Sequence, residues 1–328
     1  MSDETRETWI TRRVEMLTEQ TLTAPPRIFK DTTTFMYIDR GDIIDLEGRL
    51  FLIRGHEKEG RFGIDEQPKF WVKRALNLED GRRYILKLSC QESFWIHIGN
   101  MEVYCARSAE KEARVLELVR GDRRFMQGGS ARDSQNNLIR VIDFIDGTDL
   151  IHYLAGVDMP HERYFHELFP MILAKIVSAF RAIQLLNDNG LCHGDIRNDH
   201  ILVERATGNF RWIDFDLNQN SSTYDLWCLG NVLHFVVAKG FITFRELIQA
   251  RPQLADRFGV EDASVFFPNR VMNFSKVYGY VPDRLNEILT RFSIGATACY
   301  DTIAQVVDDL ADCANSMGCP LDEVANPQ

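Results

Sequence analysis

The segment 191–216, which reads LCHGDIRNDHILVERATGNFRWIDFD, constrains the fold of this chain more than any other part of the sequence. It begins with a polar loop that carries His193, Asp195 and His200, and continues as two short apolar runs around a Gly-Asn turn. Two such runs on either side of such a turn predict a β-hairpin. The second run ends at Asp214, so the hairpin is expected to return a carboxylate toward the polar loop.

The register of this hairpin decides which side chains meet at its open end. With Thr207 and Gly208 at the tip, paired residues have numbers that sum to about 415. Ile201 then lies opposite Asp214, and His200 arrives beside Asp214. An imidazole and two carboxylates at the mouth of a rigid hairpin are suited to hold a cation and a polyphosphate.

These motifs resemble those of the protein-kinase-like superfamily, which includes aminoglycoside and choline kinases. The match rests on the triplet HGD, which ends at Asp195, on the triplet DFD, which starts at Asp214, and on the 19-residue spacing between these two aspartates. The resemblance covers roughly residues 48–313 and implies an α+β, bilobal protein-kinase-like fold with a β-rich N-lobe and a mainly helical C-lobe. One position departs from the family pattern, because His200 stands where the family has asparagine.

The predicted domains are an N-terminal extension at 1–45, an N-lobe at 46–145 and a C-lobe at 146–328. With 328 residues, 45% of them hydrophobic, the chain can bury a core in two lobes. Its formal net charge of −10 argues against nucleic acid or an anionic membrane as partners. Seven dispersed cysteines and a charged start without an apolar signal region predict a cytoplasmic protein with reduced thiols. The oligomeric state cannot be read from the sequence.

Hydrophobic periodicity predicts the main helices and strands of both lobes. Strands are expected at 50–53, 70–76, 83–88 and 138–145, and helices near 9–17, at 106–120, from 169 to a stop at 189–190, from 222 to 238 and at 302–313. The aromatic segment 251–283 is interpreted as satellite core packing, with a substrate-facing loop as the alternative.

The strand at 83–88 alternates in polarity and places Lys87 on a partly covered face, so that its ammonium group would emerge into a cleft. The resemblance implies that Lys87 binds phosphate oxygens of ATP and that Glu112 pairs with it. For the glutamate, Glu110 and Glu117 remain alternatives. A solvated strand face is the ordinary explanation for the lysine.

Two further parts of the N-lobe are expected to contact the nucleotide. The segment 55–63 is predicted to be a turn in which Gly60 and Gly63 let backbone N–H groups approach phosphates. An ordinary hairpin loop would carry the same glycines. The resemblance implies that the carbonyl of Asp143 and the N–H of Ile145 form hydrogen bonds with the edge of adenine. The alternative is an ordinary strand end, which would have the same sequence.

The resemblance also assigns roles in the polar loop. Asp195 would orient the acceptor hydroxyl and take its proton, and Arg197 would neutralise charge on the transferred phosphoryl group. The alternative for Arg197 is a surface ion pair with Asp199. Asp225, in the motif DLWCLG, would brace the backbone of the loop, although a carboxylate in the first turn of a helix also has a local explanation. His193 is assigned a structural role.

The metal site is expected to contain Asp214 and His200. A carboxylate suits Mg²⁺, whereas an imidazole nitrogen suits Mn²⁺ better than Mg²⁺. The alternative leaves His200 as a hydrogen-bonded hairpin residue and gives the metal to Asp214, alone or with Asp216.

The sequence therefore predicts an ATP-dependent phosphotransferase that uses Mg²⁺ or Mn²⁺ and acts on a hydroxyl of a small molecule or a protein. The connection from Asp216 to Asp225 is too short for the activation segment of a protein kinase. This short connection, the missing asparagine and the DFD triplet keep a second hypothesis open, a pseudokinase that binds nucleotide or acts as a scaffold.

Overall fold

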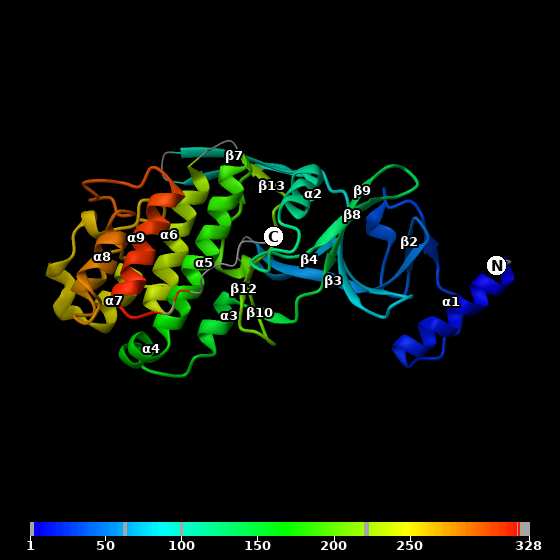
Figure 1. Cartoon of the computed structure of the whole chain (residues 1–328), viewed down its shortest axis with the longest axis horizontal. Helices are drawn as coiled ribbons and strands as arrows, with labels where there is room; N and C mark the ends of the chain where they lie inside the picture. The colour runs from blue at the N-terminus through cyan, green and yellow to red at the C-terminus, as the bar shows by residue number, and fades with distance from the viewer. Residues whose placement is uncertain (1–2, 62–63, 99–100, 220–222, 320, 322–328) are drawn as a thin grey trace. The chain divides into compact units, whose positions relative to one another are not determined.

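The computed structural model describes residues 3–61, 64–98, 101–219, 223–319 and 321 (Figure 1). Its contacts divide the chain into two compact units. Unit 1 comprises residues 1–92, 107–120 and 126–145, and unit 2 comprises residues 93–106, 121–125 and 146–328. Two short segments from the first half of the chain thus pack in unit 2. The boundaries of a separate extension and two lobes remain predictions.

Unit 1 is built on a seven-stranded sheet with the strand order β1-β2-β3-β4-β5-β9-β8. Helix α2 packs against β8 and β9. The four strands predicted for this region are present. The elements of unit 1 are α1 (Asp3–Thr18), β1 (Ile28–Phe29), β2 (Ile43–Leu46), β3 (Arg49–Arg61), β4 (Ile64–Asn77), β5 (Arg83–Lys87), α2 (Ala109–Leu118), β8 (Gly128–Arg132) and β9 (Leu138–Asp143).

The N-terminal residues contribute to the core of unit 1. Helix α1 is longer than the predicted piece at 9–17 and buries Ile10 and Val14 in a cluster with apolar side chains of β2 and β3. Residues of β2 pair with β3 in an antiparallel register, in which Ile43 lies opposite Leu52. The polar composition of this region reflects the exposed side of α1, while its buried side packs on the sheet.

Residues 55–61 belong to strand β3, where the sequence predicted a Gly-containing turn. Strand β3 continues to Arg61, which pairs with Ile64 of β4, so Gly60 lies inside the strand. Gly63 lies outside the described residues. The polar composition suggested a loop, but ladder hydrogen bonds come from the backbone and form equally well where both faces of a hairpin are polar.

Lys73 on β4 is fully buried, which is rare for a lysine. Its Nζ donates hydrogen bonds to the carbonyls of Phe35, at 3.0 Å, and Ile38, at 2.6 Å, and lies 3.3 Å from Nδ1 of His56. The two carbonyls belong to a 3₁₀ turn and the residue after it, so the lysine holds this turn against the sheet, and the carbonyl of Phe35 also accepts a hydrogen bond from the N–H of Ile38 at 3.2 Å. Burial lowers the pKa of Lys73 to about 8, although nearby aspartates oppose the shift.

This lowered pKa predicts a rise in stability at alkaline pH. The pKa of Lys73 falls from 10.5 to about 8 on folding, so between these values the unfolded chain binds more protons than the folded one. The free energy of unfolding of the wild type, relative to Lys73→Met, should therefore increase by about 2 kcal/mol from roughly pH 8 to pH 9.5. Urea denaturation of both proteins across this range measures the difference. A constant or shrinking difference would contradict the prediction.

Unit 2 is mainly helical. The three predicted C-terminal helices appear as α5, α6 and α9, with shifts of up to three residues at their ends. The elements of unit 2 are β6 (Ser93–Ile98), β7 (Met101–Arg107, of which Arg107 falls in unit 1), β10 (Gly147–Asp149), α3 (Leu150–Ala155), α4 (His161–Glu167), α5 (Phe169–Asp188), β11 (Ile201–Glu204), β12 (Phe210–Trp212), β13 (Leu217–Gln219), α6 (Tyr224–Ala238), α7 (Phe244–Ala250), α8 (Asp283–Thr290) and α9 (Ile303–Ser316).

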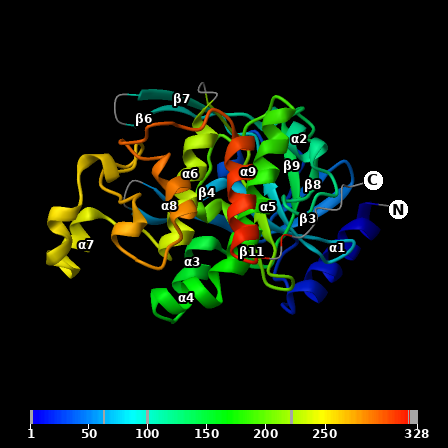
Figure 2. The ribbon, with the colours of Figure 1, turned by 60° about the vertical axis from the view of Figure 1, so that its left-hand side comes forward.

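Helix α5 forms the centre of unit 2 and lies beside α9, as Figure 2 shows. It also contacts α6 and β12. Among the described residues, α5 is the one helix whose length and composition would suit a membrane span. Its apolar side chains, including Phe169, Ile176 and Phe180, are buried within unit 2, which accounts for that composition.

The aromatic segment 251–283 serves mainly as packing. Phe274 is fully buried and its ring lies 5.2 Å from that of His234. Tyr278 stacks on His161 with 3.8 Å between ring centres, and the hydroxyl of Tyr280 donates a hydrogen bond to Nδ1 of the same histidine, whose Nε2 donates to the carbonyl of Val237. The interpretation as satellite core packing fits these contacts, while Phe267 is exposed.

A β-hairpin that the sequence did not predict precedes α2. Its strands β6 and β7 form a three-stranded sheet with β13, in the order β13-β7-β6. Strand β13 begins directly after Asp216. The residues that follow the DFD triplet are therefore held as a strand, which restricts the position of the triplet itself.

Candidate active site

Lys87, Glu112 and Arg140 form a buried charge cluster in unit 1. The Nζ of Lys87 donates a hydrogen bond to Oε1 of Glu112 at 2.7 Å, and Nε of Arg140 donates to Oε2 of the same carboxylate at 3.0 Å. All three side chains are at most 6% exposed. Glu112 is thus the residue of α2 that pairs with the lysine, whereas Glu110 and Glu117 are exposed.

The local structure explains why these three side chains meet. Ser108 caps the N-terminus of α2, since its side chain accepts a hydrogen bond from the N–H of Lys111 at 3.1 Å. This cap starts the helix so that Glu112 faces the sheet. In the sheet, Lys87 lies directly opposite Arg140 across the β5–β9 ladder. The two cations are therefore cross-strand neighbours on the side that α2 covers.

Arg140 is a site residue that sequence reasoning missed. It lies in the apolar run LIRVIDFI, where the sequence suggests only an ordinary polar residue of a strand. In the structure its Nη1 also donates to the carbonyl of Leu138 at 3.1 Å, so the guanidinium group is held by the backbone as well as by Glu112. The pairing of Arg140 with Lys87 across the β5–β9 ladder is what identifies it as a site residue. The register between two strands that are distant in the chain cannot be predicted from one sequence.

The other residues predicted to contact a nucleotide lie at the ends of unit 1 strands. Asp143 is the last residue of β9, and its N–H donates to the carbonyl of Gln127 at 2.9 Å. Ile145 follows two residues later, at the end of unit 1. Because these two roles concern backbone atoms, no side-chain contact bears on them, and they remain predictions.

In unit 2, Asp225 holds the backbone of the HGD loop. Its two carboxylate oxygens accept hydrogen bonds from the N–H groups of His193, at 2.6 Å, and Gly194, at 2.9 Å. The contact that the resemblance implies for Asp225 is therefore present. His193 is fully buried, with its ring 4.5 Å from that of Phe215 and 5.1 Å from that of Trp212. It anchors the loop in the core of unit 2.

The hairpin β11–β12 forms, but its register differs from the prediction. Ile201 pairs with Trp212, so paired numbers sum to 413 rather than to about 415. The tip is a four-residue loop, because the N–H of Glu204 donates to the carbonyl of Asn209 at 2.9 Å. The loop is centred between Ala206 and Thr207, one residue earlier than the turn assumed from Thr207 and Gly208, and this offset accounts for the shift.

His200 and Asp214 still meet, because both lie just beyond the last ladder pair. Nε2 of His200 is 3.6 Å from Oδ2 of Asp214, and Nδ1 is 2.7 Å from the carbonyl oxygen of Asp195. A carbonyl only accepts hydrogen bonds, so Nδ1 carries the proton and, in the neutral ring, Nε2 keeps a lone pair on the side of Asp214. Histidine ligands of metals commonly donate their other N–H in this manner.

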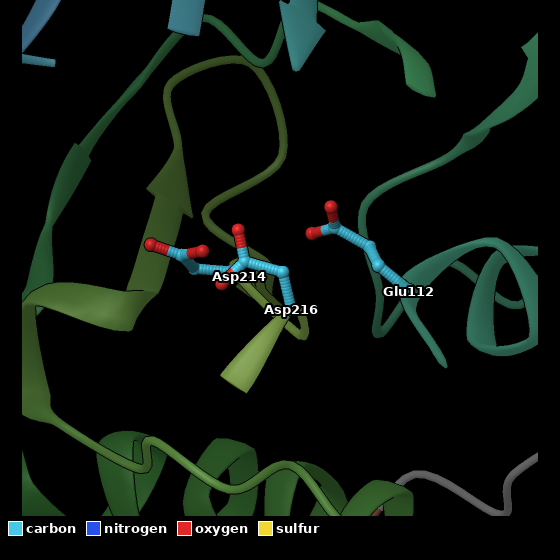
Figure 3. Close-up of side chains that lie close together, drawn as sticks. All are labelled: Glu112, Asp214 and Asp216. Atoms are coloured by element: carbon cyan, nitrogen blue, oxygen red, sulfur yellow. The ribbon is translucent and has the colours of Figure 1, made fainter. Parts of the chain in front are cut away.

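Asp214 occupies a left-handed backbone conformation, with φ of 68°. Side chains other than glycine rarely adopt it, and such strain concentrates at functional sites. Figure 3 shows Asp214 and Asp216 together on the segment that follows β12, and Glu112 on α2. The donor set of unit 2 that fits a divalent cation is thus the carboxylate of Asp214 with Nε2 of His200, with Asp216 nearby in sequence.

Arg197 forms the ion pair that was its alternative interpretation. Its Nε donates to Oδ1 of Asp199 at 2.9 Å, and both side chains are about one-third exposed. Burial alone would raise the pKa of Asp199, but His200 and the cation of Arg197 outweigh it and the pKa lies below its ordinary value. The arginine is therefore matched with an ionised carboxylate two residues away, and its predicted catalytic role remains a proposal.

Strand β7 of the unpredicted hairpin carries a buried thiol in unit 2. Burial raises the pKa of Cys105 on β7 to about 11, and the negative charge of Asp195 adds to the rise. Cys105 is fully buried and stays a neutral thiol.

Comparisons with known proteins find similarity to kinases over part of the chain. No family model matches the chain. A stretch of 146 residues is 24% identical to a Caenorhabditis elegans protein described as a ribosomal protein S6 kinase alpha-2, and covers 44% of this chain but 16% of that protein. A stretch of 112 residues is 27% identical to a Dictyostelium discoideum protein described as serine/threonine-protein kinase fnkE, and covers 33% of this chain and 8% of that protein. The chain therefore matches only a small part of each relative.

Among solved structures, the kinase domain of Mycobacterium tuberculosis PknI aligns with a TM-score of 0.43 and 14% identity, over 81% of this chain and 96% of that domain. The two curated relatives are both kinases. The chain itself combines a β-rich unit 1 with a mainly helical unit 2 and carries the HGD and DFD triplets in the latter. The chain is thus similar to kinases over part of its length, and its α+β architecture is of the class that the sequence predicted.

Proposed function

We propose that the protein is an ATP-dependent phosphotransferase that transfers the γ-phosphoryl group to a hydroxyl. The observation that carries the proposal is the buried pair of Lys87 and Glu112. Removing two charges from water costs more than most buried pairs return, so such a pair is weakly explained by stability alone. A lysine that Glu112 holds in one position is well suited to bind phosphate oxygens, which is the role that the family assigns to it.

In this proposal, Asp195 orients the acceptor hydroxyl and accepts its proton as the new bond to phosphorus forms. Its loop is held at a defined position by Asp225, which matters because catalysis of phosphoryl transfer depends chiefly on positioning and on charge neutralisation. His193 contributes by anchoring the loop in the core. Arg197, paired with Asp199, would supply positive charge beside the transferred group.

A divalent cation would be held by Asp214 and His200, with Asp216 as a further carboxylate. When bound, such a cation supplies neutralising charge to phosphate oxygens. The combination of an imidazole nitrogen and carboxylate oxygens favours Mn²⁺ over Mg²⁺, because Mg²⁺ strongly prefers oxygen ligands.

Binding of metal and ATP tests this proposal first. Saturating ATP with Mn²⁺ should raise the melting temperature of the protein, because a ligand that binds only the folded state stabilises it. Lys87→Met should weaken the shift, whereas Lys30→Met, a substitution of an exposed lysine that follows β1, should leave it unchanged. ATP turnover by the same samples then separates catalysis from binding. An unshifted melting temperature for the wild type would refute the proposal.

The second measurement concerns His200, where sequence and family disagree. If its Nε2 is a metal ligand, His200→Asn should lower the ratio of the rate with Mn²⁺ to the rate with Mg²⁺, because the substitution exchanges nitrogen for a neutral oxygen. The exposed His152, which pairs with Asp149, provides a control. Equal ratios in the wild type and His200→Asn would exclude His200 from the metal site.

The acceptor in this proposal is a small molecule, or a protein held by surfaces other than an activation segment. Eight residues, 217–224, separate Asp216 from Asp225, and three of them form β13. We retain a cytoplasmic location as part of the proposal.

The alternative is a pseudokinase that binds nucleotide without transfer. It is favoured by His200, whose imidazole lies where the family has an asparagine and contacts Asp195 through a 2.7 Å hydrogen bond to its carbonyl. A normal thermal shift with metal and ATP, together with no turnover for any acceptor in a metabolite pool, would support this alternative.

A further inference from the structure

Unit 2 contains a cavity of about 270 Å³ that lies outside the residues discussed above and is lined by several cations. The chain has a formal net charge of −10, so a local excess of positive charge needs a specific explanation. Its cationic lining comes from the segment 121–125 and from α5. We call this cavity the basic pocket, and it is lined by Arg123, Arg124, Met171, Ala174, Lys175, Ser178, Arg181, Asn209, Phe210 and Leu321.

The walls of the basic pocket are joined by one buried residue, Trp212. Its backbone N–H donates to the carbonyl of Arg124 at 2.8 Å, and its Nε1–H donates to the carbonyl of Ala179 in α5 at 2.9 Å. Trp212 also forms a parallel bridge with Phe125. The segment 121–125, strand β12 and helix α5 are therefore tied together, and the lining cations stand on a rigid frame.

The charge of the basic pocket is only partly compensated. Arg124 is paired with Asp122, with 2.9 Å between Nε and Oδ1. The ammonium group of Lys175 donates to the carbonyl of Gly208 and lies 5.8 Å from the centre of the Phe210 ring. Within the described residues, the guanidinium groups of Arg123 and Arg181 form no ion pair or hydrogen bond. These two of the four cations are therefore available to a ligand.

We propose that the basic pocket binds a small ligand that bears a phosphate group. Guanidinium groups donate paired hydrogen bonds that match phosphate oxygens, and such charge-assisted bonds are stronger than neutral ones. Phe210 and Met171 offer apolar surface for the remainder of the ligand. The volume lies just below the roughly 300–1,000 Å³ of typical ligand pockets, which favours a small phosphorylated molecule over a nucleotide.

Calorimetric titration of the full chain with pyrophosphate, at constant ionic strength and without divalent metal, tests this proposal. Arg181→Gln and Arg123→Gln should each weaken binding about tenfold. Arg245→Gln is the matched control, because it removes the same charge from an exposed position on α7 that is not part of the pocket. Titration with inorganic phosphate distinguishes a monophosphate site from one that needs two phosphoryl groups.

The same titration in Lys87→Met separates the basic pocket from the proposed nucleotide site. Binding that persists in Lys87→Met and is lost in Arg181→Gln supports the proposal. Binding that is lost in Lys87→Met, or that weakens equally in Arg245→Gln, would overturn it. Because the readout is binding, its result does not depend on whether the protein transfers phosphate.

Discussion

An Asp195→Asn variant is expected to lose phosphoryl transfer by a factor of about 10² to 10⁴ while it still binds ATP and metal. The amide keeps the shape of the side chain but cannot take a proton from the acceptor. Binding should survive because Lys87, Glu112 and Asp214 are unchanged. The rate of transfer, measured at saturating ATP and metal, gives the loss, and the thermal shift with the same ligands confirms that binding is retained.

A matched control for Asp195→Asn is Asp199→Asn, which changes the second carboxylate of the same loop. Asp199 pairs with Arg197. Loss of the Asp199 carboxylate is therefore expected to change the rate of phosphoryl transfer only through the position of Arg197. A much larger loss for Asp199→Asn than for Asp195→Asn would contradict the assignment of the base. Comparable turnover in the wild type and Asp195→Asn would show that Asp195 is not the base.

Glu112→Gln is expected to produce the largest loss of stability, about 3–5 kcal/mol in the free energy of unfolding. The carboxylate of Glu112 is fully buried and contacts both Lys87 and Arg140. The amide keeps the volume but removes the negative charge that balances two buried cations. Urea denaturation measures the effect, and Glu110→Gln, an exposed position of the same helix, should change stability by less than about 0.5 kcal/mol.

A double-mutant cycle tests whether Arg140 shares this interaction. In an Arg140→Met background, Glu112→Gln should cost less than in the wild type, because only one cation then needs the carboxylate. The expected coupling free energy is about 1–3 kcal/mol. Additive costs would show that Arg140 and Glu112 act independently, in spite of the 3.0 Å contact.

The cluster also has a consequence for how α2 is held. Arg140 is fixed by backbone carbonyls of the sheet as well as by Glu112, so the helix has two anchors on its glutamate. The pairing of Lys87 with Glu112 therefore does not depend on the lysine alone.

Short-range sequence patterns determined several helices, strands and loops of this protein. The alternation at 83–88, the helix that contains Glu112 and the polar loop with Asp195 all follow from residue types and their spacing, because each depends on contacts within a few residues. The resemblance of the HGD and DFD triplets then indicated the fold class. It also indicated the contact of Asp225 with the loop, over a separation of about 30 residues.

Tertiary structure alone decided the features that depend on distant pairing. The register of the β11–β12 hairpin differs from the prediction because the position of the loop's centre sets which residues face each other, and the residue types alone did not locate that centre. The hairpin β6–β7 and the position of Arg140 opposite Lys87 depend on pairing between distant strands, for which one sequence carries no signal. The basic pocket depends on Trp212, whose two hydrogen bonds join segments that are far apart in the chain. Periodicity reports which face of an element is buried, but only the folded chain determines what lies against that face.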